Sequence, residues 1–302
     1  MISALNYIGF SSPRYEEWLT FGPEVLGMQL AERKGDGTVR LRVDDAAHRL
    51  SIHPGQEHAL DYIGWGVRTE EELTALARRL TDNGVEVHEG TQEEVHDRAV
   101  ARMAWFEDPF GIRHELSWGQ VRFPATFRPG RALSGFVTGE QGLGHAVLVV
   151  PDLERADEFF GGVLGFRLSD RIVDPPLSAR FYHCNGRHHS LAVAEVPGMA
   201  GFQHLMLETQ SLDDVGTAYD LCEERDVPIV LTLGRHTNDL MTSFYLYSPA
   251  GFHIEYGTGA LTVDDDSWEP ATYHETKIWG HRGTRHRDEL PFGIIHSVNE
   301  GS

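Results

Sequence analysis

Residues 142–152 read Gly-Leu-Gly-His-Ala-Val-Leu-Val-Val-Pro-Asp. The apolar run that begins at His145 predicts a short strand, and the Pro151-Asp152 pair predicts its end and the start of a helix. One histidine at the head of a strand does not by itself indicate a function. Its meaning depends on two later strands and on the first half of the chain.

Two later segments also predict strands that carry a metal-capable side chain. One reads Gln-His-Leu-Met-Leu-Glu at residues 203–208, and the other reads Gly-Phe-His-Ile-Glu-Tyr-Gly at residues 251–257. Successive side chains of a strand point to opposite faces, so His204 and Glu255 can lie on the same face of a sheet as His145.

The first half of the chain repeats the plan of the second half. Tyr7 lies 19 residues before a Leu-Gly-Met segment, as His145 lies 19 residues before a Leu-Gly-Phe segment. Residues 109–115 align in the same frame with residues 249–255. Self-similarity of this kind predicts a duplicated architecture.

The two halves differ at the positions that this frame matches. The second half has two imidazoles and a carboxylate where the first half has a phenol, a glycine and a carboxylate: His145, His204 and Glu255 against Tyr7, Gly64 and Glu115. Two histidines and one carboxylate on one face, with coordination positions left free, are the ligand set of non-haem Fe(II) oxygenases. The second half is therefore predicted to bind the metal, and Glu115 is interpreted as structural.

The pattern predicts an α+β fold of four βαβββ modules that pair into two barrel-like domains. Residues 1–133 form the N-terminal domain, with two modules and no metal, and residues 134–302 form the C-terminal catalytic domain, with two modules and a polar surface tail after Gly259. Strands are expected near residues 5–10, 28–33, 39–43, 49–54, 62–67, 85–89, 101–107, 112–118, 145–150, 166–172, 179–184, 190–195, 203–208, 229–233, 242–247 and 252–256. Helices are expected near residues 13–25, 69–82, 152–164 and 211–221.

The charge of the chain excludes polyanionic partners. Lys and Arg number 26 against 46 Asp and Glu, for a formal net charge of −20, which repels nucleic acid and anionic membranes. We find no apolar run near the roughly 20 residues that cross a bilayer, and no signal-peptide pattern at the first residues. Cys184 and Cys222 are interpreted as free thiols in a reducing compartment. These observations predict a soluble, cytoplasmic protein that acts on a small molecule.

Five short motifs, in this order and spacing, carry a family resemblance. They are Gly-Leu-Gly-His at 142–145, Cys-Asn-Gly-Arg-His-His-Ser-Leu-Ala at 184–192, Gly-Arg-His-Thr-Asn-Asp at 234–239, Ser-Phe-Tyr at 243–245, and the segment 251–257. With them the chain resembles, over residues 1 to about 280, the type I extradiol catechol dioxygenases of the vicinal oxygen chelate (glyoxalase-like) superfamily. The resemblance is greatest to the two-domain enzymes that act on 2,3-dihydroxybiphenyl.

The resemblance implies a role for each residue of a site. It implies that Fe(II) is bound by His145, His204 and Glu255, in agreement with the comparison of the halves. It also implies that His189 is the acid/base histidine, that His236 and Tyr245 lie around the catecholate and the oxygen, that Asn238 and Asp239 support His236, and that Phe181 lines the pocket. The chain departs from many relatives in having Gln203, where they have histidine, before the ligand His204.

Other histidines are given plainer interpretations. His188 is hardly distinguishable from His189 without the family pattern, and His253 is interpreted as a neighbour of the ligand Glu255. The histidines of the tail, His274, His281 and His286, are expected in solvent, and His53, His58 and His114 on the surface or in packing. Tyr245 could also be a core residue, because aromatic side chains suit strands.

The leading hypothesis is extradiol cleavage of a substituted catechol by O2, most simply 2,3-dihydroxybiphenyl or a similar 3-substituted catechol, in the degradation of aromatic compounds. The resemblance also implies a homo-oligomer, because relatives commonly assemble. Two alternatives stay open: another metal-dependent enzyme of this fold, such as a glyoxalase-like lyase or a thiol transferase, and a metal-free binding protein. Mn(II) is the alternative to Fe(II), because the ligand set suits both.

Overall fold

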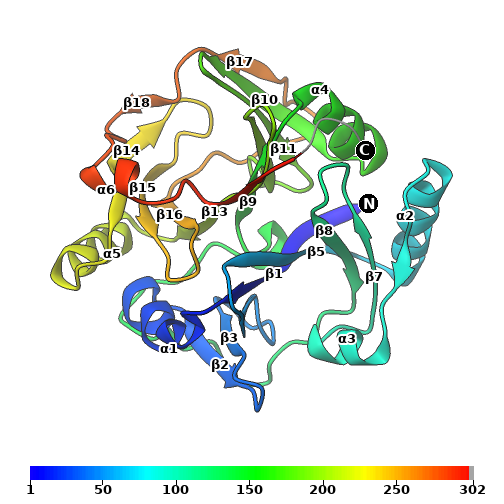
Figure 1. Ribbon diagram of the computed structural model, residues 1–302, viewed down its shortest axis with the longest axis horizontal. Helices are drawn as coiled ribbons and strands as arrows, with labels where there is room; N and C mark the ends of the chain where they lie inside the picture. Colours follow the sequence, from blue (N-terminus) through cyan, green and yellow to red (C-terminus); the bar gives the residue numbers. More distant parts are fainter. Residues whose placement is uncertain (299–302) are drawn as a thin grey trace.

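One strand-helix-strand-strand-strand unit, repeated four times, builds the chain (Figure 1). The computed structural model describes residues 1–298. The last four residues of the predicted second domain, 299–302, lie outside the described residues.

The first half contains two modules. The first consists of β1 (Ile2–Ser12), three short helical segments η1 (Tyr15–Glu17), α1 (Trp18–Thr20) and η2 (Phe21–Leu26), and then β2 (Gln29–Arg33), β3 (Val39–Arg42) and β4 (Leu50–Pro54). The second consists of β5 (Ala59–Val67), α2 (Glu70–Asp82), β6 (His88–Glu89), α3 (Gln92–Asp97), β7 (Arg102–Glu107) and β8 (Arg113–Trp118). The strand expected near 85–89 is therefore only two residues long.

The second half repeats this order. The third module consists of β9 (His145–Val150), α4 (Leu153–Ala156), η4 (Asp157–Val163), β10 (Arg167–Asp174), β11 (Leu177–His183) and β12 (Leu191–Glu195), preceded by the short turn η3 (Gly139–Gln141). The fourth consists of β13 (Met199–Thr209), α5 (Leu212–Glu224), β14 (Ile229–His236), β15 (Thr242–Tyr247) and β16 (His253–Thr258). The tail adds β17 (Ala271–Tyr273), β18 (Lys277–Trp279), α6 (Arg285–Glu289) and β19 (Ile294–Ser297).

The helices differ in regularity. The Thr69 hydroxyl caps α2 by accepting from the Glu72 N–H, and Leu73, Leu76 and Leu80 form its buried face, as a regular amphipathic helix requires. The helix predicted near 13–25 is irregular and divides into η1, α1 and η2, as the matching helix near 152–164 divides into α4 and η4. None of the helices in residues 1–298 is both long and apolar enough to cross a membrane.

Two sheets share one topology. The first has the strand order β2-β3-β4-β1-β5-β8-β7-β6, and the second β17-β10-β11-β12-β9-β13-β16-β15-β14-β18, with β19 on β13. The first strands of paired modules run antiparallel, β1 against β5 and β9 against β13. The last strand of each module runs parallel to its first strand. The predicted α+β fold of four βαβββ modules is confirmed.

Strand register corrects one match between the halves. Gly64 pairs with both Tyr7 and Glu115, whereas in the second half it is Met206 that pairs with both His145 and Glu255. Gly64 is therefore the counterpart of Met206.

The residue two positions before Gly64 is the true counterpart of His204. Tyr62 pairs with Gly9, as His204 pairs with Val147, so Tyr62 occupies the position of His204. The match of Gly64 with His204 was wrong, because the first half has two more residues between the paired positions of β5 and β8 than the second half has between those of β13 and β16.

A single apolar core runs through both halves. Phe10 of β1 stacks on Phe252, which precedes β16, with ring centroids 4.1 Å apart, and Trp65 of β5 meets the edge of Phe166 at 5.0 Å. The two sheets lie on either side of the predicted boundary between residues 133 and 134. The division into two separate domains stays a prediction.

The segment after Gly259 is not only a surface tail. Its three strands extend the second sheet, β17 beside β10, β18 beside β14 and β19 beside β13. Figure 1 shows this orange and red segment passing across the second sheet. Edge strands exchange backbone hydrogen bonds and tolerate polar side chains, so their composition resembled that of a solvated tail.

Candidate metal centre

Three adjacent strands bring the predicted metal ligands together. His145 begins β9, His204 lies in β13, which pairs with β9, and Glu255 lies in β16, which pairs with β13. The alternation of side chains along these strands turns all three to the same face. Their exposed fractions are 1%, 7% and 2%, so none of the three points to open solvent.

The three donor atoms form a small triangle. His145 Nε2 lies 3.1 Å from His204 Nε2 and 3.2 Å from Glu255 Oε2, and His204 Nε2 lies 3.3 Å from the same oxygen. Ligands about 2.1 Å from a metal ion lie about 3 Å apart when they are neighbours at right angles. The residues therefore fit a metal ion, and among residues 1–298 they form one of two clusters with this capacity.

The environment of the carboxylate keeps it ionised. Burial alone would raise the pKa of Glu255, but hydrogen bonds with His145, His204 and His236 hold that pKa well below its usual range. Its Oε1 accepts from the Ser243 hydroxyl at 2.6 Å. The carboxylate thus presents its other oxygen, as an anion, to the two imidazoles.

His189 lies against the first ligand. Its ring stacks on His145 with centroids 3.9 Å apart, and Phe181 meets its edge at 5.0 Å. Burial, reinforced by the neighbouring imidazoles, lowers the pKa of His189 well below its usual value, so the ring is neutral near pH 7.

A hydrogen-bond chain sets the tautomer of His189. A neutral His188 donates from Nε2 to Asp170 at 2.9 Å and accepts at Nδ1. It receives the proton of His189 Nδ1 at 3.0 Å. His189 Nε2 therefore carries a lone pair, as a general base needs. The preference for His189 over His188 is consistent with this arrangement, since His188 is occupied on both nitrogens.

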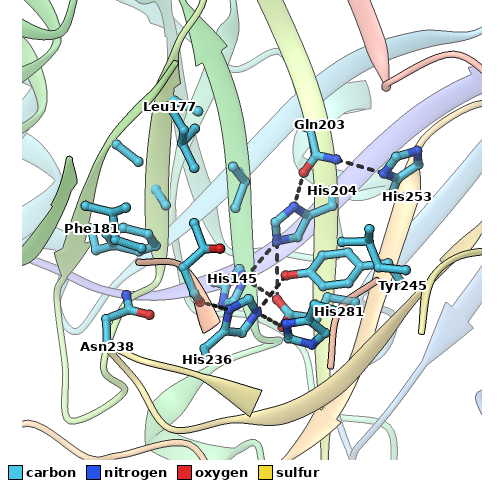
Figure 2. Close-up of a pocket in the computed structure, with 18 of the residues that line it drawn as sticks. His145, Leu177, Phe181, Gln203, His204, His236, Asn238, Tyr245, His253 and His281 are labelled. Atoms are coloured by element: carbon cyan, nitrogen blue, oxygen red, sulfur yellow. Dashed lines mark hydrogen bonds and ion pairs between the residues drawn. The ribbon is translucent and has the colours of Figure 1, made fainter. Parts of the chain in front are cut away.

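His236 and Tyr245 also lie beside the cluster (Figure 2). His236 donates from Nδ1 to the Thr276 carbonyl at 2.9 Å, and its Nε2 lies 3.1 Å from Glu255 Oε1 and 2.9 Å from the Tyr245 hydroxyl. Burial would lower the pKa of His236, but the hydrogen bond with Glu255 raises it to about 9. His236 is therefore a cation near pH 7 in the metal-free protein.

Asn238 and Asp239 are buried beside these groups. Asn238 donates to Asp170 at 3.4 Å, so it joins the chain that orients His189. Burial raises the pKa of Asp239, although the nearby His236 opposes this shift. Asp239 also lies in a second cluster of donor atoms with His188 and His189.

The cluster lies in a cavity of about 400 Å³. Much of the rest of its lining is apolar and includes Val147, Ile172, Leu177, Ala179, Phe181 and Ala192. Small-molecule sites have volumes of about 300–1,000 Å³ and are lined mainly by such side chains. The tail closes another side of the cavity with Thr276, Lys277, His281, Arg287 and Phe292.

His281 was wrongly expected in solvent. It is 6% exposed, its ring centroid lies 4.3 Å from that of His236, and its Nε2 lies 3.0 Å from the Ser243 carbonyl. The apolar pair Ile278-Trp279, just before it, was the available sequence signal of a strand. His274 is exposed and His286 half-buried, and His114 is a fully buried packing residue bonded to Trp65 and Asp108.

Paired βαβββ modules around a buried His-His-Glu cluster define a class of proteins, the vicinal oxygen chelate superfamily. The family model described as Glyoxalase/Bleomycin resistance protein/Dioxygenase superfamily matches residues 142–256, and the model for dihydroxybiphenyl dioxygenase BphC D1 matches residues 5–55.

Comparison with individual proteins identifies the family within this superfamily. The chain is 41% identical to biphenyl-2,3-diol 1,2-dioxygenase of Paraburkholderia xenovorans, over 94% of this chain and 96% of that protein. It is 39% identical to an iron-dependent extradiol dioxygenase of Rhodococcus jostii, over 93% and 97%. The crystal structure of BphC, a halotolerant catechol dioxygenase, superposes with a TM-score of 0.95 and 48% identity, over 99% of both chains. The chain belongs to the extradiol ring-cleaving dioxygenases.

Proposed function

We propose that this protein binds Fe(II) through His145, His204 and Glu255 and cleaves the ring of a 3-substituted catechol beside its two hydroxyl groups. Both atoms of O2 enter the product. One observation carries the proposal: three donor atoms, 3.1–3.3 Å apart, converge in a cavity whose remaining lining is largely apolar. Family membership supports the reaction class, and the ligand triangle supports the metal.

The protein's side chains handle the protons. Bound Fe(II) would hold the catechol and O2 side by side, lower the cost of deprotonating the catechol and pass electron density between them. His189, with a free lone pair on Nε2, takes the proton from a substrate hydroxyl and returns it later. A neutral imidazole is required for the first of these steps, and burial keeps His189 neutral.

Other side chains beside the cluster supply hydrogen-bond donors. His236 is a cation that can stabilise negative charge as it grows on oxygen, and Tyr245 can donate to a substrate oxygen. Asn238 acts through Asp170 and His188 on the orientation of His189. Asp239 contributes negative charge close to His236.

The apolar lining indicates the substituent on the ring. A catechol whose hydroxyl groups face the ligands would direct its remaining carbon skeleton at Phe181, Leu177 and Ile172. An unsubstituted catechol would leave this surface uncovered. The names of several relatives specify biphenyl-2,3-diol, so we propose 2,3-dihydroxybiphenyl or a similar apolar catechol in aromatic-compound degradation.

Fe(II), rather than Mn(II), is proposed because the relative in Rhodococcus jostii is described as iron-dependent.

We further propose a cytoplasmic homo-oligomer. The free thiols of Cys184 and Cys222 support a reducing compartment. The apolar side chains of Ile278 and Trp279, 55% and 48% exposed on the strand β18 at the edge of the sheet, support association with another copy.

The test is anaerobic reconstitution with Fe(II), followed by oxygen uptake with catechol, 3-methylcatechol and 2,3-dihydroxybiphenyl. We expect one O2 consumed per diol, a yellow ring-opened product, and the highest kcat/KM for the biphenyl diol. Mn(II) is loaded in parallel. Metal binding without oxygen uptake would favour another reaction of this superfamily, and failure to bind either metal would favour a metal-free binding protein.

A further inference from the structure

Gln203 lies directly behind the metal ligand His204. It is 7% exposed, and its amide is placed between two imidazoles, His204 and His253 (Figure 2). Its Oε1 contacts His204 Nδ1, and its Nε2 lies 2.8 Å from His253 Nδ1. The resemblance of the chain to its relatives does not explain this residue, because many of them have histidine here.

A backbone carbonyl of the tail determines the orientation of the Gln203 side-chain amide. Gln203 Nε2 also lies 3.4 Å from the carbonyl oxygen of Phe292. A carbonyl can only accept, so the amide group facing it must be the NH2. The amide oxygen of Gln203 therefore faces His204, and it can accept only if His204 carries its proton on Nδ1.

The orientation of His253 agrees with this polarity. Its Nδ1 faces the Gln203 NH2 and must accept, which leaves its proton on Nε2. Gln203 thus accepts from His204 and donates to His253 and to the Phe292 carbonyl.

We propose that Gln203 is a positioning residue that holds His204 in the Nδ1–H tautomer and so presents the Nε2 lone pair to the metal. Through Gln203, the carbonyl of Phe292 assists in building the metal centre. This proposal rests on the metal centre proposed above. Partners of this kind orient a ligand imidazole and raise its basicity.

The other imidazole ligand has no such support. His145 Nδ1 is buried without a hydrogen-bond partner in the described part of the chain. Its ring is held by stacking on His189 instead. The two histidine ligands are therefore held in different ways, and removal of Gln203 should affect one of them and not the other.

The tail is firmly attached where it meets Gln203. β19 pairs antiparallel with β13, with Ile294 opposite Phe202 and Ile295 opposite Gly201. A side chain at Gly201 would place its Cβ 2.1 Å from the Ile294 carbonyl oxygen. Glycine there permits the close approach of β19 that places the Phe292 carbonyl at the Gln203 amide.

The first measurement is metal affinity without turnover. We would titrate the metal-free protein with Co(II) and follow its visible absorption. Gln203→Leu keeps the size of the side chain but removes the acceptor, and we expect a Kd weaker by about 10–100-fold. Gln203→Glu keeps an acceptor facing His204 Nδ1 and should stay near the wild-type Kd. His253→Phe should have a smaller effect than Gln203→Leu, because the Phe292 carbonyl still orients the amide.

The second measurement distinguishes positioning from general damage. In the Co(II)-loaded protein, the Nδ1–H proton of each histidine ligand gives a shifted and exchangeable proton resonance. The His204 proton should exchange slowly in the wild type, and in Gln203→Leu it should exchange fast or disappear. The His145 resonance should be unchanged in both proteins.

The outcomes separate the two proposals. If the wild type does not bind Co(II) or Fe(II), the metal centre itself is wrong. If the wild type binds Co(II) and Gln203→Leu binds it equally well with an unchanged His204 resonance, the role of Gln203 is overturned. Equal weakening in Gln203→Leu and Gln203→Glu would also overturn it.

Discussion

The two halves of the molecule bury a carboxylate at the same register and neutralise it differently. Glu255 faces the imidazoles of His145, His204 and His236. Glu115, its counterpart, accepts from Arg98 Nε and Nη2, each at 2.9 Å.

Other groups complete the first-half cluster. Arg113 and the Tyr7 hydroxyl also contact Glu115, at 2.9 Å and 3.0 Å. The Arg98 guanidinium lies 3.5 Å from the ring centroid of Tyr62, the counterpart of His204. A cation that belongs to the chain thus takes the place that an exchangeable metal ion can take in the second half.

This difference indicates that the fold requires a cation beside the buried carboxylate and that this cation need not be a metal ion. An ionised carboxylate out of water is costly unless it is paired. Arginine supplies a permanent, hydrogen-bonding partner and gives stability only. In the second half, protonated His236 lies beside Glu255 Oε1, whereas the imidazoles of His145 and His204 leave a place beside Oε2 for a metal ion, and that ion can carry chemistry.

The largest expected effect comes from removing a ligand. Glu255→Ala or His145→Ala should weaken Fe(II) binding by more than about 100-fold, since even an outer partner of a ligand contributes about 10–100-fold, and turnover should vanish with the metal. Iron per protein after anaerobic loading measures this. The matched variant in the first half, Glu115→Gln, should keep the full iron content. Full iron in Glu255→Ala would contradict the assignment of the site.

The histidine proposed as acid/base group has a counterpart in the first half that tests its specificity. Strand pairing places Leu50 beside Ile8, as Leu191 lies beside Ala146, so His48 corresponds to His189. His189→Ala should keep its iron while kcat falls by about 10²–10⁴-fold. His48→Ala should leave kcat unchanged. Similar losses of kcat in both variants would indicate a general structural effect.

A third variant removes the permanent cation. Arg98→Leu leaves Glu115 buried with an incomplete set of partners, and we expect a loss of about 3–5 kcal/mol in the free energy of unfolding. Denaturant unfolding of the metal-free protein measures it. The double variant Arg98→Leu/Glu115→Leu should recover much of the loss, because no unpaired charge remains. Iron binding at the second half should be unaffected.

The smallest effect is expected when the first half is given the ligand set of the second half. This variant is also the sharpest test of the comparison. Tyr7→His/Tyr62→His/Arg98→Ala places two imidazoles at the matched positions and removes Arg98 from the Glu115 carboxylate. We expect weak binding of a second equivalent of Co(II), seen as a second phase in a titration. With Arg98 retained, Tyr7→His/Tyr62→His should bind a single equivalent. A second equivalent in that double variant would show that arginine does not occupy the metal position.

Parts of the site could be predicted because they follow from strand periodicity and repetition. His145, His204 and Glu255 each lie within a clear apolar strand, so their faces were predictable. The match of His204 with Gly64 failed. The first half has two more residues between the paired positions of β5 and β8 than the second half has between those of β13 and β16. This difference does not alter the hydrophobic pattern from which the match was made. Only the hydrogen-bonded register identifies Tyr62 as the counterpart.

The tail was misjudged for a different reason. β17, β18 and β19 are three or four residues long and are held by backbone hydrogen bonds to strands far away in the chain. Such short edge strands have no periodic side-chain pattern of their own. His281 and the carbonyl of Phe292 could not be placed beside the site without that pairing.

The sequence by itself determined the duplicated α+β architecture and the identity of the three metal-capable side chains, because apolar periodicity and residue type are local properties. Only the tertiary structure shows which nitrogen of each imidazole is free, that Arg98 lies beside Glu115 in the first half, and that the tail reaches Gln203. Those are properties of contacts between distant strands, and their geometry depends on register and on backbone groups that every residue shares.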